Sequence, residues 1–129
     1  MGAKVHCPGT AQKSGNRFLQ KCRDSDTLAF MYMNVFRSRK RADYDAAAYA
    51  ADAARMGQLA QAQPGFLDYK SFAATDGETV TISVWESVEA ARAWACHPEH
   101  RQVQARGREA YYEQFTMYAC DDARVRVFP

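Results

Sequence analysis

The sequence predicts a single α+β domain of the ferredoxin-like type, a sandwich with the element order β-α-β-β-α-β. Three observations lead to this fold class. Alternating apolar residues mark four strands, an alanine-rich stretch follows the first strand, and a helical stretch opening with proline precedes the last. This order is that of the split βαβ motif. A chain of 129 residues is long enough for one such domain.

The first strand is expected in the run LAFMYMNVF, at residues 28–36. Both of its faces are mostly apolar, which is typical of a strand that is covered on both sides. Asn34 is the exception, because it is a polar residue on a face with aromatic neighbours. The basic run at residues 37–41 is expected to form a solvated strand end or loop.

The stretch ADYDAAAYAADAARMGQLAQAQ, at residues 42–63, predicts a helix because alanine is the best helix former. Asp43 can cap its N-terminus, and Pro64–Gly65 ends it. Its expected apolar stripe consists of Tyr44, Ala47, Ala48, Ala51, Met56 and Leu59.

Two strands, GFLDYKSFAA and ETVTISVWE, flank the turn Thr75–Asp76–Gly77 and predict a hairpin. In the second strand an aliphatic row of alternate residues (80, 82 and 84) occupies one face. Trp85 is expected on the opposite, more polar face.

The rest of the chain predicts two helices and a strand. Ser87 caps VEAARAWA, and Pro98 opens PEHRQVQARGREAYY, because proline fits the first turn of a helix. The final strand is expected in EQFTMYAC and continues in RVRVF. Helices on one face would leave the other, apolar face of the sheet bare, so we expect a homodimer.

Composition excludes several classes of function. The net charge of +2 is too small to indicate nucleic-acid binding, and no apolar run is long enough to span a membrane. The N-terminal stretch lacks an apolar core of the signal-peptide type, so we expect a cytoplasmic protein. Cys96, His97 and His100 lack a fourth ligand nearby, so no metal site is expected. Residues 1–27 are polar and interrupted by glycine, which predicts a flexible N-terminal extension before a domain at 28–129.

Several motifs together resemble the antibiotic biosynthesis monooxygenase domain of the dimeric α/β-barrel superfamily. They are Pro64–Gly65–Phe66, VWES at 84–87, a second tryptophan at 94, and HPEHRQVQARGREAYYEQF. The resemblance covers about residues 28–128. It implies a homodimer that acts on a small molecule and O₂, either without a cofactor on phenolic or quinol-like substrates, or as a haem-binding and haem-opening protein.

Residue by residue, the resemblance to the cofactor-independent oxygenases is partial. Their strand-end tryptophan matches Trp85. Their asparagine falls on Thr81, their tyrosine on Ala91, and their helical arginine near Ala105.

The resemblance to the haem-degrading members is partial as well. Their asparagine matches Asn34 and their helical tryptophan matches Trp94. Their proximal histidine falls at Val103 or Gln104, one helical turn after His100.

Cofactor-independent oxygenation requires a dry pocket and a base with a pKa near neutral, for which histidine is suited. His100 is the first candidate for the base, and His97, which can also cap the helix, is the second. Asn34 is the candidate for binding the developing oxyanion. The complete predicted site has His100, Asn34 and Trp85 as catalytic residues and Tyr32, Phe66, Trp94 and Gln104 as substrate-binding residues.

Three functions remain open at this point. The leading hypothesis is a cofactor-independent monooxygenase acting on a small aromatic substrate. The second is a haem-binding or haem-degrading protein. The third is a non-catalytic dimeric binding or stress module, in which both tryptophans are core residues and His100 is a surface or interface residue.

Overall fold

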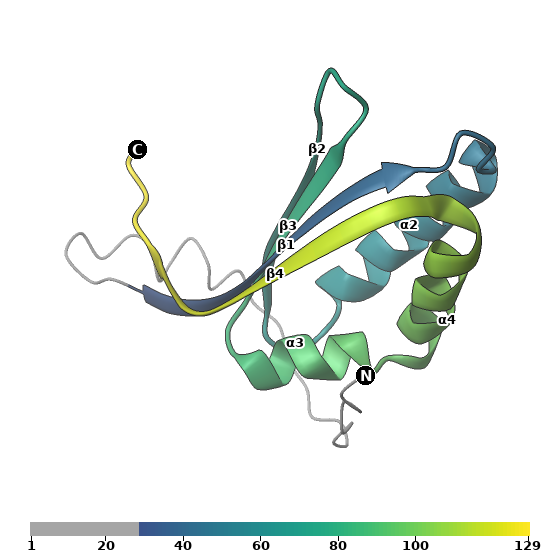
Figure 1. Cartoon of the computed structure of the whole chain (residues 1–129). Helices are drawn as coiled ribbons and strands as arrows, with labels where there is room; N and C mark the ends of the chain where they lie inside the picture. The colour runs from purple at the N-terminus through teal and green to yellow at the C-terminus, as the bar shows by residue number, and fades with distance from the viewer. Residues whose placement is uncertain (1–28) are drawn as a thin grey trace.

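The fold is known from a computed structural model, which describes residues 29–129 (Figure 1). The predicted extension at 1–27 lies outside the described residues. The elements in chain order are β1 (Ala29–Lys40), α2 (Ala46–Gln61), β2 (Phe66–Ala73), β3 (Thr79–Trp85), α3 (Val88–Ala95), α4 (Pro98–Arg106), the π-helical turn η1 (Gly107–Tyr111) and β4 (Tyr112–Val125). This order confirms the predicted ferredoxin-like fold.

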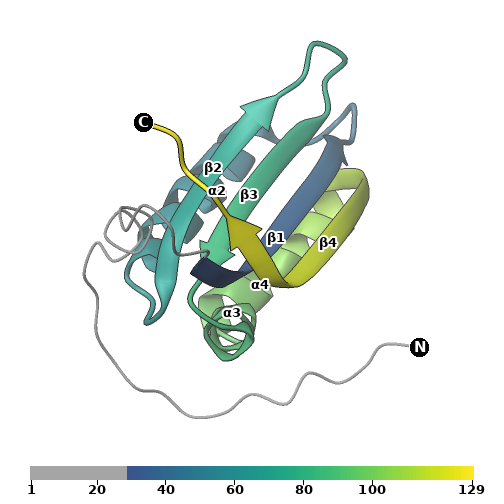
Figure 2. The ribbon, with the colours of Figure 1, turned by 90° about the vertical axis from the view of Figure 1, so that its left-hand side faces the viewer.

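The four strands form one antiparallel sheet in the order β2-β3-β1-β4. All of the helices lie on one face of this sheet, and Figure 2 views the opposite face, which we call the open face. The hairpin β2–β3 is on one side of β1 and the long strand β4 on the other. Within residues 29–129, no helix is long and apolar enough to cross a membrane.

Strand β1 is longer than the sequence indicated. Its pairing with β4 continues through the basic run as far as Lys40, which lies opposite Tyr112. Ser38, in the middle of this run, is only 3% exposed. The run is therefore part of the sheet, and alternation sends its side chains to opposite faces.

Helix α2 corrects two expectations. Asp45, not Asp43, caps it, because the Asp45 carboxylate accepts a hydrogen bond from the backbone N–H of Ala48 at 3.0 Å. The buried side agrees with the predicted stripe only in part, because Met56 and Leu59 pack against the core cluster around Trp85 but two of the alanines do not. Gly57 and Ala60 are buried, whereas Ala47 and Ala51 are exposed. Alanine gains little from burial, so the predicted alanine stripe did not determine which side faces the sheet.

Two apolar clusters lie on opposite faces of the sheet. Between the sheet and the helices, Trp85, only 1% exposed, packs with Ala60, Ala91 and Trp94. On the other face, Met31 and Val84 form the second cluster. The two clusters confirm that Trp85 points away from the aliphatic row of β3.

Helix α4 ends earlier than predicted. The expected helix at 98–112 is helical to Arg106, passes through the π-helical turn and enters β4 at Tyr112. Gly107 permits this path, because a Cβ added there would lie 2.7 Å from Cε2 of the Tyr112 ring. The absence of a side chain at 107 thus lets Tyr112 pack against the turn that precedes it.

We predict that Gly107→Ala lowers the free energy of unfolding by about 1–3 kcal/mol, the usual cost of overpacking. Urea denaturation followed by circular dichroism measures this loss. In a Tyr112→Ala background the obstructing ring is absent, so the same substitution should cost much less. An equal cost in both backgrounds would show that the Tyr112 ring is not the reason for glycine at 107.

Candidate functional site

A cavity of about 460 Å³ lies between the helix-facing side of the sheet and helices α2, α3 and α4. Its floor is formed by residues of all four strands. Its wall and roof come from the three helices and from η1. The aromatic and polar side chains that line it include Asn34, Tyr49, Asp52, Phe66, Ser83, Trp85, Trp94, His100, Gln104, Arg108, Tyr111 and Tyr112.

A continuous aromatic stack runs from the sheet to one wall of the cavity. Phe66 meets Trp85 edge to face, with ring centres 5.5 Å apart. Trp85 stacks on Trp94 at 6.4 Å, and Trp94 stacks on the imidazole of His100 at 4.1 Å with only 20° between the ring planes. Such contacts fix ring orientation. The stack therefore sets the plane in which His100 lies.

The polar contacts of His100 define which of its nitrogens carries the proton. Its Nδ1 lies 3.0 Å from the backbone carbonyl oxygen of Trp94. A carbonyl can only accept, so Nδ1 carries the hydrogen and Nε2 has a free lone pair. Nε2 lies 3.5 Å from the side-chain nitrogen of Gln104, another residue lining the cavity. The unprotonated nitrogen thus faces the cavity side of the ring.

The surroundings of His100 keep its imidazole neutral. Burial lowers its pKa below the ordinary value of 6.5. The hydrogen bond to Trp94 acts in the opposite direction, and the charge of His97 adds to the lowering. A buried imidazole with a lowered pKa is unprotonated at neutral pH and can accept a proton.

The floor of the cavity also carries polar side chains. Asn34 on β1 lies opposite Ser83 on β3, and both line the cavity. Ser83 accepts a hydrogen bond from Nε1 of Trp85 at 3.3 Å. The carboxamide of Asn34 makes no hydrogen bond with the described residues, so its donor and acceptor are available to a bound molecule.

At the other end of the cavity, Asp52 joins α2 to the end of α4. Arg106 donates to both of its carboxylate oxygens, at 2.8 and 2.9 Å, and the Tyr111 hydroxyl donates to one of them at 2.6 Å. The bonds from Arg106 are the main reason that the pKa of Asp52 is lowered. The bond to Asp52 and burial raise the pKa of Tyr111. Asp52, Arg106 and Tyr111 are therefore hydrogen-bonded to one another and form a structural clamp between α2 and the end of α4.

The structure brings six of the seven predicted site residues to the cavity wall. These are Asn34, Phe66, Trp85, Trp94, His100 and Gln104. The seventh, Tyr32, packs instead against the core cluster around Trp85. His97 is the N-cap of α4, where its Nδ1 accepts from the Glu99 backbone N–H at 3.2 Å.

Sequence reasoning missed the far end of the cavity. Tyr49, Asp52, Tyr111 and Tyr112 all line it, and Arg106, although exposed, is held by Asp52. The two partners of Asp52 lie 54 and 59 residues away along the chain. One local signal did exist, because Tyr49, Asp52 and Met56 follow helical spacing along α2.

Haem would need an axial ligand, and His100 is the one histidine among the described residues that line the cavity. The Gln104 amide nitrogen lies 3.5 Å from its Nε2, so it occupies the place that an iron atom would need, although so long a contact does not use up the Nε2 lone pair. As they lie, these residues do not fit axial ligation. We therefore assign no chemistry to haem.

We predict that His100 makes the protein lose stability on acidification. Its pKa is near 6.5 in the unfolded chain and lower in the folded one. Between these two values the unfolded chain binds more protons, so stability falls as the pH falls. His100→Gln should weaken this fall. The check is the difference in unfolding free energy between about pH 7.5 and about pH 5 in urea titrations; an identical pH dependence in both proteins would contradict the assignment.

The comparisons with known proteins agree with this fold. The sequence matches the family model described as antibiotic biosynthesis monooxygenase over residues 31–106. The uncharacterized protein YqjZ of Bacillus subtilis (strain 168) is 38% identical over 80 residues, which cover 62% of this chain and 70% of that protein.

Two solved structures are similar in fold. SnoaB, a cofactor-independent oxygenase from Streptomyces nogalater, matches with a TM-score of 0.58 at 20% identity, over 74% of this chain and 97% of its own. Rv0793 from Mycobacterium tuberculosis matches with a TM-score of 0.63 at 20% identity, over 70% of this chain and 92% of its own. The family match spans more than half of the sequence, and the chain therefore belongs to the antibiotic biosynthesis monooxygenase family.

Proposed function

We propose that this protein is a cofactor-independent monooxygenase that oxygenates a small phenolic or quinol-like aromatic substrate in the cavity. The observation that carries the proposal is the neutral imidazole of His100, held by Trp94 with its unprotonated Nε2 beside the cavity. A base of this kind removes the proton that makes a phenol a good reductant for O₂. The likeness to SnoaB, which is a cofactor-independent oxygenase, supports the proposal at the level of fold.

The first step is a proton transfer. A substrate hydroxyl gives its proton to Nε2 of His100, and the Trp94 carbonyl stabilises the resulting imidazolium through its bond to Nδ1–H. The free carboxamide of Asn34 donates a hydrogen bond to the phenolate oxygen. Gln104 lies beside the imidazole and helps to orient the hydroxyl.

The second step uses the electrons of the phenolate. The anion transfers one electron to O₂, and the two radicals combine to form a bond between oxygen and a ring carbon. His100 gives its proton to the resulting peroxide anion, which becomes a hydroperoxide. The hydrogen on the same ring carbon then passes to His100 as a proton, while the O–O bond breaks and releases hydroxide, leaving a quinone carbonyl. For 1-naphthol the balance is C₁₀H₈O + O₂ → C₁₀H₆O₂ + H₂O, with one oxygen atom entering the product. His100 returns its proton to the departing hydroxide.

The cavity suits an aromatic substrate on physical grounds. Aromatic rings of Phe66, Trp85 and Trp94 form part of its lining, and a small number of polar groups, among them Asn34, His100 and Gln104, lie between the apolar ones. Pockets of this type bind by apolar contact and use a few polar groups to fix orientation. Its volume of about 460 Å³ is within the usual range for small-molecule sites.

We predict that His100→Gln lowers kcat/KM by a factor of about 10² to 10⁴, the usual contribution of a general base. Oxygen uptake with 1-naphthol and anthrone as probes, together with incorporation of ¹⁸O from ¹⁸O₂, measures it. Gln102→Ala is the matched control, because Gln102 is exposed on the same helix. The His100 step is wrong if uptake on a substrate that the wild-type protein oxygenates is unchanged in His100→Gln.

Two measurements separate the oxygenase from a non-catalytic binding module and from a haem protein. Saturable binding of an aromatic probe without oxygen uptake would favour a non-catalytic binding module. A haemin titration covers the haem alternative. One haem bound per chain, with a Soret shift lost in His100→Gln, would replace the oxygenase proposal by haem chemistry.

We further propose that the active form is a homodimer built through the open face. Phe72 on β2 and Tyr118 on β4 are 49% and 46% exposed there, and Ile82 is only partly buried. Water-exposed apolar patches of this kind commonly mark interfaces.

We predict that sedimentation velocity gives the mass of a dimer for the wild-type protein and of a monomer for Ile82→Lys. A lysine at this position would bury an unpaired charge in the interface. Gln102→Lys places the same charge on the helical side and should leave the dimer intact. A wild-type protein that is monomeric at every concentration would contradict the dimer.

A further inference from the structure

The charges around the cavity are unevenly compensated. Among the described residues that line it, only Asp52 and Arg108 carry a full charge at neutral pH, since His100 is neutral. Asp52 is paired with Arg106 and with the Tyr111 hydroxyl. The guanidinium of Arg108 makes no hydrogen bond or ion pair with the described residues. The cavity therefore has one uncompensated charge, and it is positive.

Two further cations lie at the same, tyrosine-rich end of the cavity. Arg41 donates to the backbone carbonyls of Arg108 and Tyr112, at 3.2 and 3.1 Å. Lys40 places its ammonium 4.5 Å from the ring centre of Tyr49, which lines the cavity, and donates to the Thr79 hydroxyl. Neither side chain forms an ion pair with a carboxylate of the described residues. Together they make the tyrosine-rich end of the cavity electropositive.

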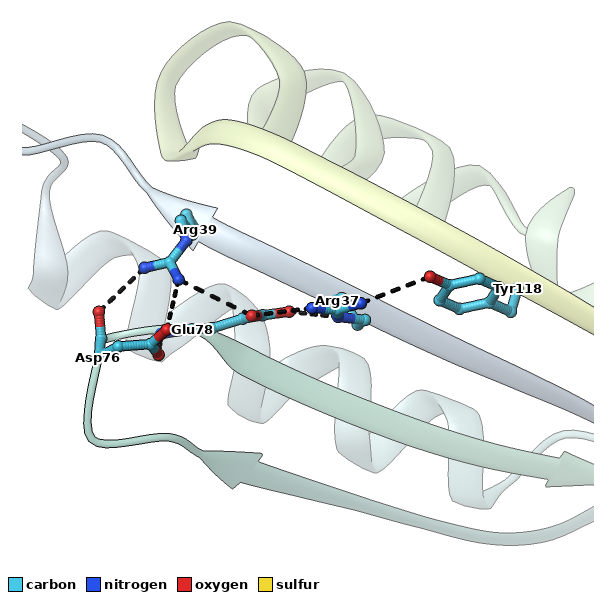
Figure 3. A network of polar contacts seen from close by, with 5 residues as sticks. All are labelled: Arg37, Arg39, Asp76, Glu78 and Tyr118. Atoms are coloured by element: carbon cyan, nitrogen blue, oxygen red, sulfur yellow. Dashed lines mark hydrogen bonds and ion pairs between the residues drawn. The ribbon is translucent and has the colours of Figure 1, made fainter.

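Arg37 and Arg39 belong to the same basic run, at residues 37–41, but their charges are compensated. Figure 3 shows Arg37 and Arg39 on the open face, where Arg37 pairs with Glu78 and Arg39 with Asp76. Arg37 also contacts the Tyr118 hydroxyl at 3.4 Å. Within this run the two arginines on the open face are therefore neutralised, whereas Lys40 and Arg41 have no carboxylate partner among the described residues.

We propose that the natural ligand of this cavity is an aromatic acid whose carboxylate binds Arg108. The inference rests on the proposed function, because it assumes that the cavity is the substrate site. A guanidinium is the side chain best suited to a carboxylate, which it can bind through two parallel hydrogen bonds. Arg41 and Lys40 add attraction at the same end without contacting the ligand directly.

The positions of His100 and Arg108 also orient the ligand. They are eight residues apart along α4 and η1, which corresponds to roughly 12 Å at 1.5 Å per residue. The reacting hydroxyl lies at the His100 end, so the carboxylate has to be at the opposite end of the aromatic system. An acid group adjacent to the hydroxyl would not reach Arg108.

The test compares naphthalene ligands by isothermal titration calorimetry. We expect 6-hydroxy-2-naphthoate, with its groups at opposite ends, to bind about tenfold tighter than 2-naphthol, a difference of about 1.4 kcal/mol. The isomer 3-hydroxy-2-naphthoate should show no such gain. The preference should shrink as salt is raised. Equal binding of 6-hydroxy-2-naphthoate and 2-naphthol, or an equal gain for both acids, would overturn the proposal.

Variants assign the preference to Arg108. Arg108→Gln should abolish it, and Arg108→Lys should keep part of it. Arg101→Gln, at an exposed position of α4 outside the cavity lining, should leave it unchanged. A preference that survives in Arg108→Gln would overturn the assignment.

This measurement is independent of catalysis. His100→Gln should retain the preference for 6-hydroxy-2-naphthoate, because the carboxylate binds at the other end of the cavity. If the preference is found but the wild-type protein takes up no oxygen with any ligand, the oxygenase proposal fails and the ligand class stands. If oxygen is taken up with 2-naphthol and the acid gives no advantage, the ligand class fails and the oxygenase proposal stands.

Discussion

The site depends on Trp94, which holds His100 in two ways. Its indole ring stacks on the imidazole, and its backbone carbonyl accepts the Nδ1–H bond. This carbonyl lies in the last turn of α3, where carbonyl groups have no partner within their own helix. It also accepts the backbone N–H of His97 at 3.0 Å, which directs the chain into α4. One peptide group therefore both sets the angle between the helices and selects the tautomer of the base.

The two faces of the sheet explain why the cavity exists. Strict alternation along β3 sends the aliphatic residues to the open face and Ser83 and Trp85 to the helical face. Serine and asparagine side chains are too small to fill the space beneath the helices, so a cavity is left over a polar floor. The clamp of Asp52, Arg106 and Tyr111 fixes α2 to the end of α4 and closes the far end of that space.

The sequence allowed the fold to be predicted because its signals are local. Pro64–Gly65 ends α2, Ser87 caps α3 and Pro98 opens α4, each through the geometry of its own turn. The position of His100 one turn before Gln104 likewise followed from helical spacing alone. In the predicted stripe of α2, Met56 and Leu59 do face the core, but the exposed Ala47 and Ala51 do not, because alanine is nearly indifferent to burial and the packing partner determines which side is covered.

The remainder of the site depends on contacts that local patterns do not encode. Asp52 meets Arg106 and Tyr111 across more than fifty residues of chain. The π-helical turn at 107–111 also changes the register of the side chains that follow, so Tyr111 and Tyr112 both reach the cavity although they are adjacent. Arg108 is in the same turn and is exposed, yet it also lines the cavity, which no local pattern in the sequence indicates.

The protonation state of His100 is the central claim, and ¹⁵N NMR of the imidazole tests it most directly. The account predicts, at neutral pH, a protonated Nδ1, an unprotonated Nε2 and a titration midpoint below 6.5. The opposite tautomer would contradict it, because Nε2 would then have no free lone pair with which to take the substrate's proton. A midpoint at or above 6.5 would contradict the lowering of the His100 pKa by burial.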